Sequence, residues 1–175
     1  MSDELKLLKI DHPLLKKVPE EFNFEEHDAK EYSRKLNARM IELGGVGLSA
    51  NQVGLDMRVF VIGVQNPKTK ETFTRTLFNP LLVEVNEDTS IAEEGCLSIP
   101  GFRLHVKRPT ECVITYHNVD NEVVTERFLG IAARVALHEY DHMLGTNFMH
   151  RVSKLKMQRA IKALDKKVRR VTNGR

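Results

Sequence analysis

The chain has 175 residues, of which 27 are Lys or Arg and 24 are Asp or Glu, so its formal net charge is +3. This length is typical of one domain with its own hydrophobic core, and we expect a single domain over residues 1–175. No long apolar run, secretory leader, internal repeat or low-complexity segment is found, which excludes membrane-spanning and fibrous classes. Two cysteines in such a chain are typical of a reducing compartment, so we expect a cytoplasmic protein.

The first half of the chain contains one helical pattern and two strand patterns. Apolar residues recur at the spacing of one helical face in residues 29–43, and Gly44 and Gly45 follow as a stop. Residues 58–64 and 77–85 are rich in β-branched and aromatic residues, which predicts two strands.

The second half adds a hairpin and two helices. Residues 111–116 and 123–128 alternate apolar and polar residues around an Asp-Asn pair, which predicts a hairpin. Residues 130–144 have apolar residues on several helical faces, so we expect a central, buried helix. A last helix is predicted over about residues 153–170, with Ser153 as its cap. This order of elements indicates an α+β fold.

The terminal helix carries most of the charge asymmetry. From residue 151 to the end there are ten Lys or Arg and one acid, a balance of +9, whereas the first 150 residues hold 17 basic and 23 acidic residues. Its apolar residues also recur at helical spacing: Met157, Ile161, Leu164 and Val168. The pattern predicts an amphipathic helix, and its positive charge suits an anionic partner such as ribosomal RNA.

Residues 138–142, with the sequence HEYDH, form the strongest chemical motif. His138 and His142 are four residues apart, so on a helix both imidazoles lie on one face and can bind the same ion. Glu139 projects beside them, where it could move protons. The motif does not itself contain a third protein ligand.

Zinc proteases with this motif take their third ligand from downstream residues. One subtype uses a Glu, but no Glu follows His142 in this chain. Another uses H-E-x-x-H-x-x-G-x-x-H, and here Gly145 occupies the glycine position while Phe148 stands where the third His belongs. His150 comes two residues late. A metallopeptidase therefore remains only an alternative.

An upstream cysteine is the better candidate for the third ligand. Cys96 lies in residues 94–98, EGCLS, where the neighbouring glycine, serine and proline indicate a turn. One Cys and two His, with water in the fourth position, make an open catalytic metal site. Cys112 lies inside a predicted strand and is interpreted as a small buried hydrophobic residue.

Three segments in this order are similar to the peptide deformylases: residues 45–52 (GVGLSANQ), 94–98 (EGCLS) and 138–142 (HEYDH). The resemblance runs over nearly the whole chain. It implies small antiparallel or mixed sheets around a metal-bearing helix. It also implies a hydrolase that removes the formyl group from the N-terminal formylmethionine of newly made polypeptides, which releases formate.

The resemblance further implies a role for each catalytic residue. Cys96, His138 and His142 would hold one divalent ion, Fe²⁺ in the cell, which Zn²⁺, Ni²⁺ or Co²⁺ can replace. The ion lowers the pKa of water to about 7, and Glu139 would take the proton and deliver it to the departing amine. The Gln52 amide and the Leu97 backbone N–H match the donors to the developing oxyanion.

Substrate binding is assigned in the same way. The glycines at 45 and 47 let an extended peptide pair closely with the backbone, and three apolar residues form a methionine pocket. The substrate-binding residues implied are Gly45, Val46, Gly47, Glu94, Gly95, Ile131 and Val135. We also expect Glu94, with Arg103 or Arg108, to brace the Cys96 segment.

Several positions depart from the commonest family pattern or have no assigned role. Ser49 replaces an Ala and Leu137 replaces a Gln, and a buried Ser49 hydroxyl would need a hydrogen-bond partner. Arg134 is expected to narrow or charge the rim of the pocket, and Asp141 has no assigned role.

The expected partners are nascent formyl-methionyl peptides and, through the basic terminal helix, the ribosome. We expect a monomer that does not bind membranes. The second alternative function, beside the metallopeptidase, is an inactive homologue that docks on ribosomes.

Overall fold

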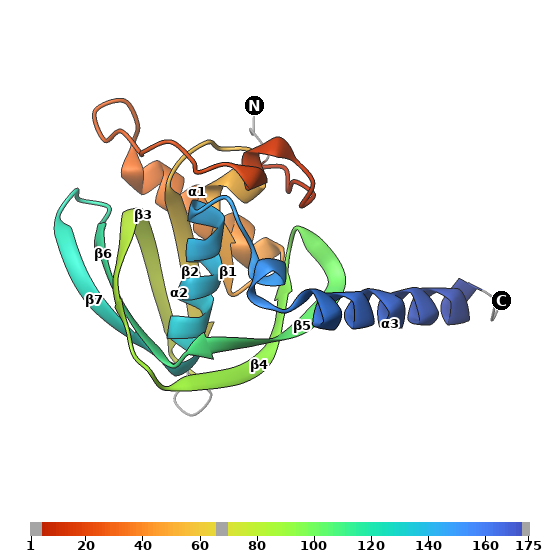
Figure 1. The fold of residues 1–175 in the computed structure, drawn as a ribbon. Coiled ribbons are helices and arrows are strands. Elements are labelled where there is room, and N and C mark those ends of the chain that lie inside the picture. The colour runs from red at the N-terminus through yellow and green to blue at the C-terminus, as the bar shows by residue number, and fades with distance from the viewer. Residues whose placement is uncertain (1–4, 66–69, 173–175) are drawn as a thin grey trace.

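The computed structural model describes residues 5–65 and 70–172, with the side chains of the last helix described up to residue 166. Its elements, shown in Figure 1, confirm the predicted α+β class. They are the 3-10 helices η1 (Pro13–Lys16), η2 (Ala50–Val53) and η3 (Phe148–Arg151), the α-helices α1 (Ala29–Glu42), α2 (Gly130–Met143) and α3 (Lys154–Thr172), and the strands β1 (Gly47–Ser49), β2 (Val59–Gln65), β3 (Thr72–Val85), β4 (Thr89–Cys96), β5 (Ile99–Pro109), β6 (Glu111–His117) and β7 (Val123–Leu129).

The strands form two antiparallel sheets. The larger sheet has five strands in the order β1-β2-β3-β6-β7, and the smaller is the two-stranded ribbon β4–β5. The long strand β3 pairs with β2 from Thr72 to Phe78 and with β6 from Phe78 to Val85, so it joins the two halves of the larger sheet.

The helix α2 lies at the centre of the molecule, in contact with strands of both sheets (Figure 1). Every residue from 133 to 143 is buried. Its apolar residues pack with those of β2, β6 and β7, whereas its polar residues face the β4–β5 ribbon. The predicted central, buried helix is confirmed, and the coverage by two sheets explains why its apolar residues occupy several faces.

The other predicted elements are also found. Helix α1 begins at Ala29 after an Asp28 cap and ends before Gly44, whose φ of +66° suits glycine after a helix. The two predicted strands correspond to β2 and β3, although β3 begins five residues before the predicted start at 77. The predicted hairpin is β6–β7. The β4–β5 ribbon was not predicted.

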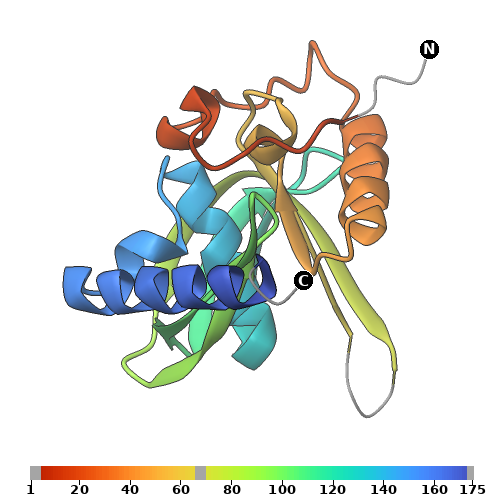
Figure 2. The same cartoon turned by 90° about the vertical axis from the view of Figure 1, so that its right-hand side faces the viewer.

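The terminal helix α3 crosses the side of the ribbon and projects beyond it (Figures 1 and 2). The Ser153 hydroxyl accepts a hydrogen bond from the Lys156 N–H at 3.3 Å, which confirms the predicted cap. Met157, Ala160 and Leu164 pack against the ribbon and η3. Ile161 was expected in this stripe, but it is 46% exposed because the contact face is centred on Ala160 instead. The side chain of Val168 lies outside the described residues.

Across residues 5–65 and 70–172, no helix combines the length and apolar character that crossing a membrane requires.

Candidate active site

Three side chains from two distant segments converge beside α2. Cys96 is the last residue of β4 and is followed at once by the tight turn that leads into β5. His138 and His142 lie one helical turn apart on α2. The candidate ligand atoms of these residues all lie within 4.8 Å of one another, and all three side chains are buried. The structure thus brings the three predicted ligands together.

This donor set fits a divalent transition-metal ion. One thiolate and two imidazoles suit borderline ions such as Fe²⁺, Co²⁺, Ni²⁺ and Zn²⁺. His138 Nδ1 lies 3.1 Å from a carboxylate oxygen of Glu94, which leaves Nε2 for an ion. The Sγ of Cys96 lies 3.5 Å from Nε2 of His142, so the remaining donors point at the same place.

The two imidazoles differ in charge when no ion is present. Burial, together with the positive charge of His138, lowers the pKa of His142 to about 3, so its ring is neutral and can donate a lone pair. Burial opposes protonation of His138, but hydrogen bonds with Cys96 and Glu94 raise its pKa to about 10. An ion bound at His138 Nε2 would have to displace this proton.

Glu139 lies beside this cluster, with its carboxylate against β1. Burial raises its pKa to about 7, and its Oε2 has no hydrogen-bond partner among the described residues. A Cβ at Gly47 would lie 2.9 Å from the Glu139 Cδ. Gly47 was predicted to contact the peptide, and the structure adds a second reason for glycine here, because any side chain at this position would displace the Glu139 carboxylate.

A buried network of charges orients His138. Arg108 donates to both oxygens of Glu94, at 2.7 and 2.9 Å, and the Arg108 Nη2 also donates to Asp141 at 3.0 Å. Arg151 binds the same Asp141 carboxylate. Although burial opposes ionisation of Glu94, its bonds to His138 and Arg108 lower its pKa to about 2. Glu94 is therefore a permanent carboxylate that holds His138.

These contacts show which arginine holds Glu94 and what Asp141 does. Arg108 holds Glu94, whereas Arg103 forms an exposed pair with Glu93 at 3.9 Å. Asp141, to which the sequence assigned no role, is a structural acid that fixes Arg108 from its other side.

Arg134 was expected to narrow or charge the rim of the pocket. It does line the cavity, but its side chain is buried and its charge is paired, so that it links α2 to the ribbon. It donates to Glu94 at 2.7 Å, to the Val106 carbonyl at 3.1 Å and to the Ser90 carbonyl and hydroxyl at 2.9 Å. These four bonds use all the hydrogens on its two terminal nitrogens.

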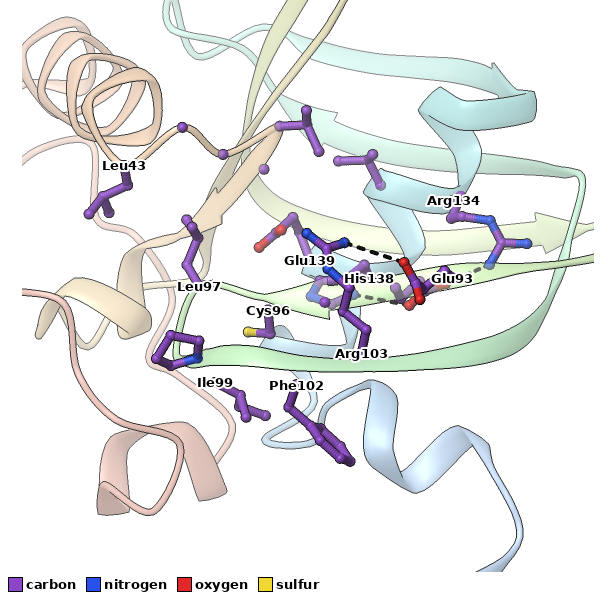
Figure 3. Close-up of a pocket in the computed structure, with 18 of the residues that line it drawn as sticks. Leu43, Glu93, Cys96, Leu97, Ile99, Phe102, Arg103, Arg134, His138 and Glu139 are labelled. Atoms are coloured by element: carbon purple, nitrogen blue, oxygen red, sulfur yellow. Dashed lines mark hydrogen bonds and ion pairs between the residues drawn. The ribbon is translucent and has the colours of Figure 1, made fainter. Parts of the chain in front are cut away.

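A cavity of about 520 Å³ opens beside the cluster (Figure 3). Figure 3 shows Cys96, His138 and Glu139 together on one side, with Arg134 away from them. All the residues predicted to bind substrate line this cavity: Gly45, Val46, Gly47, Glu94, Gly95, Ile131 and Val135. Along α2 the lining residues Ile131, Val135 and His138 lie on one helical face, so the apolar walls extend away from the ligands.

Comparison with known proteins identifies the family to which this chain belongs. A family model described as polypeptide deformylase matches residues 4–158. The chain belongs to this family.

Individual deformylases are similar in sequence and in structure. A peptide deformylase of Cytophaga hutchinsonii is 39% identical over 146 residues, which cover 82% of this chain and 79% of the relative. A peptide deformylase from Plasmodium falciparum has a TM-score of 0.81 at 32% identity and covers 96% of this chain and 98% of its own. A class I type b peptide deformylase from Acinetobacter baumannii, solved with Met-Ala-Ser bound, has a TM-score of 0.78 at 30% identity over 87% of this chain and 100% of its own.

The predicted resemblance is thereby confirmed, and the deformylase is a metal-dependent hydrolase that removes the formyl group from N-terminal formylmethionine. Neither the metallopeptidase nor the inactive docking protein is favoured. Phe148, which occupies the position of the third protease ligand, is fully buried and stacks on the His138 ring at a centroid distance of 5.6 Å. In this deformylase that position packs against a candidate metal ligand.

The two predicted oxyanion donors also lie at the site. The Gln52 Nε2 donates to the Cys96 sulfur at 3.2 Å and to the Ser98 hydroxyl at 3.1 Å, and Leu97 lines the cavity. The other cysteine, Cys112, is packed in the core, where burial raises the pKa of its thiol to about 12. This environment agrees with the interpretation of Cys112 as a structural residue.

Proposed function

We propose that Cys96, His138 and His142 hold the divalent ion of this deformylase and that Glu139 transfers protons during removal of the formyl group. The observation that carries the proposal is the convergence of three buried ligand atoms within 4.8 Å beside a cavity that the Glu139 side chain also lines. When bound, the ion lowers the pKa of water toward about 7 and polarises the carbonyl oxygen of the substrate.

Glu139 has the properties of a general base and acid. Its pKa of about 7 lets the carboxylate take a proton from the attacking water near neutral pH and return it to the amine nitrogen that departs. The Oε2 atom has no protein partner among the described residues, so it is available for this exchange. The Gln52 amide and the Leu97 N–H donate to the oxygen on which negative charge develops, and each donor is worth about 2.7–4 kcal/mol. For this, Gln52 Nε2 exchanges one of its two hydrogen bonds, to Cys96 or to Ser98, for a bond to that oxygen.

The substrate occupies the cavity as an extended peptide. β1 and β4 are edge strands, so the backbone of residues 45–47 and Gly95 is available to pair with it. The methionine side chain packs against Val46, Ile131 and Val135. Because apolar pockets discriminate by only about 1–3 kcal/mol per methylene, we expect some tolerance at the first residue.

The reaction is tested with formyl-Met-Ala-Ser and an unformylated internal peptide, each incubated with the metal-loaded enzyme. Met-Ala-Ser, which deformylation would leave, is the peptide bound in the Acinetobacter baumannii structure. We expect formate from the first peptide and no new amine from the second. Cleavage of the internal peptide would support a metallopeptidase, and no product from either would support a docking protein.

We further propose that Fe²⁺ is the ion in the cell and that Zn²⁺, Ni²⁺ or Co²⁺ can replace it, because the Cys-His-His donors suit all four. Exposure to air should inactivate the iron form faster than the zinc form, since iron and the Cys96 thiolate are oxidised. Formate release before and after aeration, with metal content measured each time, checks this. Equal initial activity and equal loss in both forms would contradict it.

The basic helix α3 is proposed to contact ribosomal RNA. Its described cations at residues 154, 159, 162 and 166 are exposed, and the helix extends past the ribbon (Figure 1). Truncation after Val152 should abolish co-sedimentation with ribosomes at low salt. A full-length variant with these four cations changed to Gln keeps the packing of Met157 and Leu164, and it should lose most binding too. Unchanged sedimentation of both variants would exclude this contact.

We also propose that the enzyme acts as a monomer in the cytoplasm, where its two free, buried cysteines remain reduced. Light scattering coupled to size-exclusion chromatography measures the first property, and a dimer mass would contradict it. Cell fractionation measures the second, and recovery outside the cytoplasmic fraction would contradict it.

A further inference from the structure

The environment of Ser49 assigns it a function that the family pattern does not require. We propose that the Ser49 hydroxyl is a positioning group that holds the Gln52 amide in place, with the amide nitrogen toward the Cys96 sulfur and the reacting carbonyl. This inference rests on the proposed function of Gln52 as a donor to the oxyanion.

Ser49 ends β1 and immediately precedes η2, which carries Gln52. The side chain of Ser49 is fully buried, and its backbone N–H and its hydroxyl both donate to the Gln52 Oε1, at 3.0 and 2.9 Å. The buried hydroxyl thus has the partner that its burial requires. Both bonds end on a single atom, the oxygen of the Gln52 amide.

The opposite end of the same amide makes the contacts that matter for chemistry. Gln52 Nε2 donates to the Cys96 sulfur at 3.2 Å and to the Ser98 hydroxyl at 3.1 Å. Gln52 and Ser98 are both almost completely buried. The amide therefore bridges η2 and the turn that follows Cys96, with donors on one side and acceptors on the other.

Orientation decides whether this bridge works, because the oxygen and nitrogen ends of an amide have almost the same shape. A rotation of 180° would place the Gln52 oxygen against the Cys96 sulfur, where two acceptors would repel each other. It would also turn the Nε2 donors toward the Ser49 N–H, which is itself a donor. The Ser49 N–H and the Cys96 sulfur therefore select this orientation, and the Ser49 hydroxyl adds a second hydrogen bond to Oε1 that holds the amide in place. An alanine at this position would supply only the backbone donor.

A purely structural alternative is that the Ser49 hydroxyl only stabilises the start of η2. The two explanations predict different effects when the hydroxyl is removed. If the hydroxyl is only a cap, its removal lowers the stability of the protein whether or not Gln52 is present. If it is a positioning group, its removal acts through Gln52 and changes the environment of the Cys96 sulfur. The test must therefore measure Gln52-dependent turnover and the sulfur itself.

The test uses Ser49→Ala, Gln52→Ala and the double variant in full-length, cobalt-loaded protein. Ser49→Ala should lower kcat for formyl-Met-Ala-Ser about 2- to 10-fold with KM nearly unchanged, the size expected for one hydrogen bond. It should also shift the thiolate-to-cobalt charge-transfer absorption. In the Gln52→Ala background, Ser49→Ala should have no further effect on either readout.

Ser33→Ala is the matched control. Ser33 lies on α1, away from the site, and its hydroxyl is hydrogen-bonded to the Thr76 hydroxyl of β3 at 2.7 Å. It should leave kcat and the absorption band unchanged. The proposal is overturned if Ser49→Ala leaves both readouts unchanged, or if it has the same effect with and without Gln52.

The absorption band does not depend on turnover. If the wild-type protein released no formate, the proposed function would fail while the link from Ser49 to Cys96 could still be measured.

Discussion

Replacement of Glu139 by alanine is expected to lower formate release from formyl-Met-Ala-Ser by about 10²–10⁴-fold while the metal remains bound. The three ligand atoms belong to other side chains, so the ion keeps its protein donors. The variant lacks only the buried carboxylate that we propose to accept and return the proton. Glu139→Gln should show a loss of the same order, because an amide of nearly the same shape cannot carry that proton.

The measurement is kcat at saturating peptide, together with the metal content of each variant. Glu93→Gln is the matched control, since Glu93 also lines the cavity but is about half exposed and pairs with the exposed Arg103. It should retain near wild-type turnover. Substantial activity in Glu139→Ala with full metal content would remove Glu139 from the mechanism.

Arg108→Met is expected to destabilise the metal-free protein by about 3–5 kcal/mol, the usual cost of removing one partner from a buried ion pair. The Arg108 side chain is 4% exposed and bridges Glu94 and Asp141, which are 5% and 1% exposed. Methionine fills much of the same volume but leaves both carboxylates without this cation. Glu94 would keep Arg134 and Asp141 would keep Arg151, so the chain should still fold.

Urea unfolding of the metal-free protein measures this effect. Arg127→Met is the control, because Arg127 pairs with Glu111 at 2.8 Å near the surface, where the two side chains are 58% and 35% exposed. An exposed pair of this kind is worth about 0–1 kcal/mol. If the free energy of unfolding fell by a similar amount in the two variants, the buried network would not depend on Arg108.

Periodicity was a sufficient guide where an element has one clearly apolar face or is apolar throughout. It predicted α1, α2 and the β6–β7 hairpin, and it failed for the β4–β5 ribbon. In β4 the side chain that points inward at position 94 is a glutamate, so the buried face has no apolar alternation to detect. In β5 the apolar residues Phe102, Leu104 and Val106 alternate with polar ones, so the pattern of a strand was present and was overlooked.

The residues of the candidate site were predicted from short motifs, but their supporting partners were not. Glu94 and Arg134 are 40 residues apart in the chain and meet only because α2 packs against the ribbon. Asp141 had no assignable role for the same reason, since Arg108 reaches it from β5. Local patterns report which side chains share an element, whereas these contacts depend on how two elements dock.

The division of the metal ligands between α2 and β4 has a consequence for how the protein forms. A partly folded chain with an intact α2 offers an ion only two imidazoles, because the thiolate arrives with the β4–β5 ribbon. Tight metal uptake therefore waits for the docking of these two elements. Once bound, the ion stabilises only the fully assembled state, so its binding energy adds to the cooperativity of folding. With the proposed ligands, the metal centre is complete only when α2 and the β4–β5 ribbon have docked.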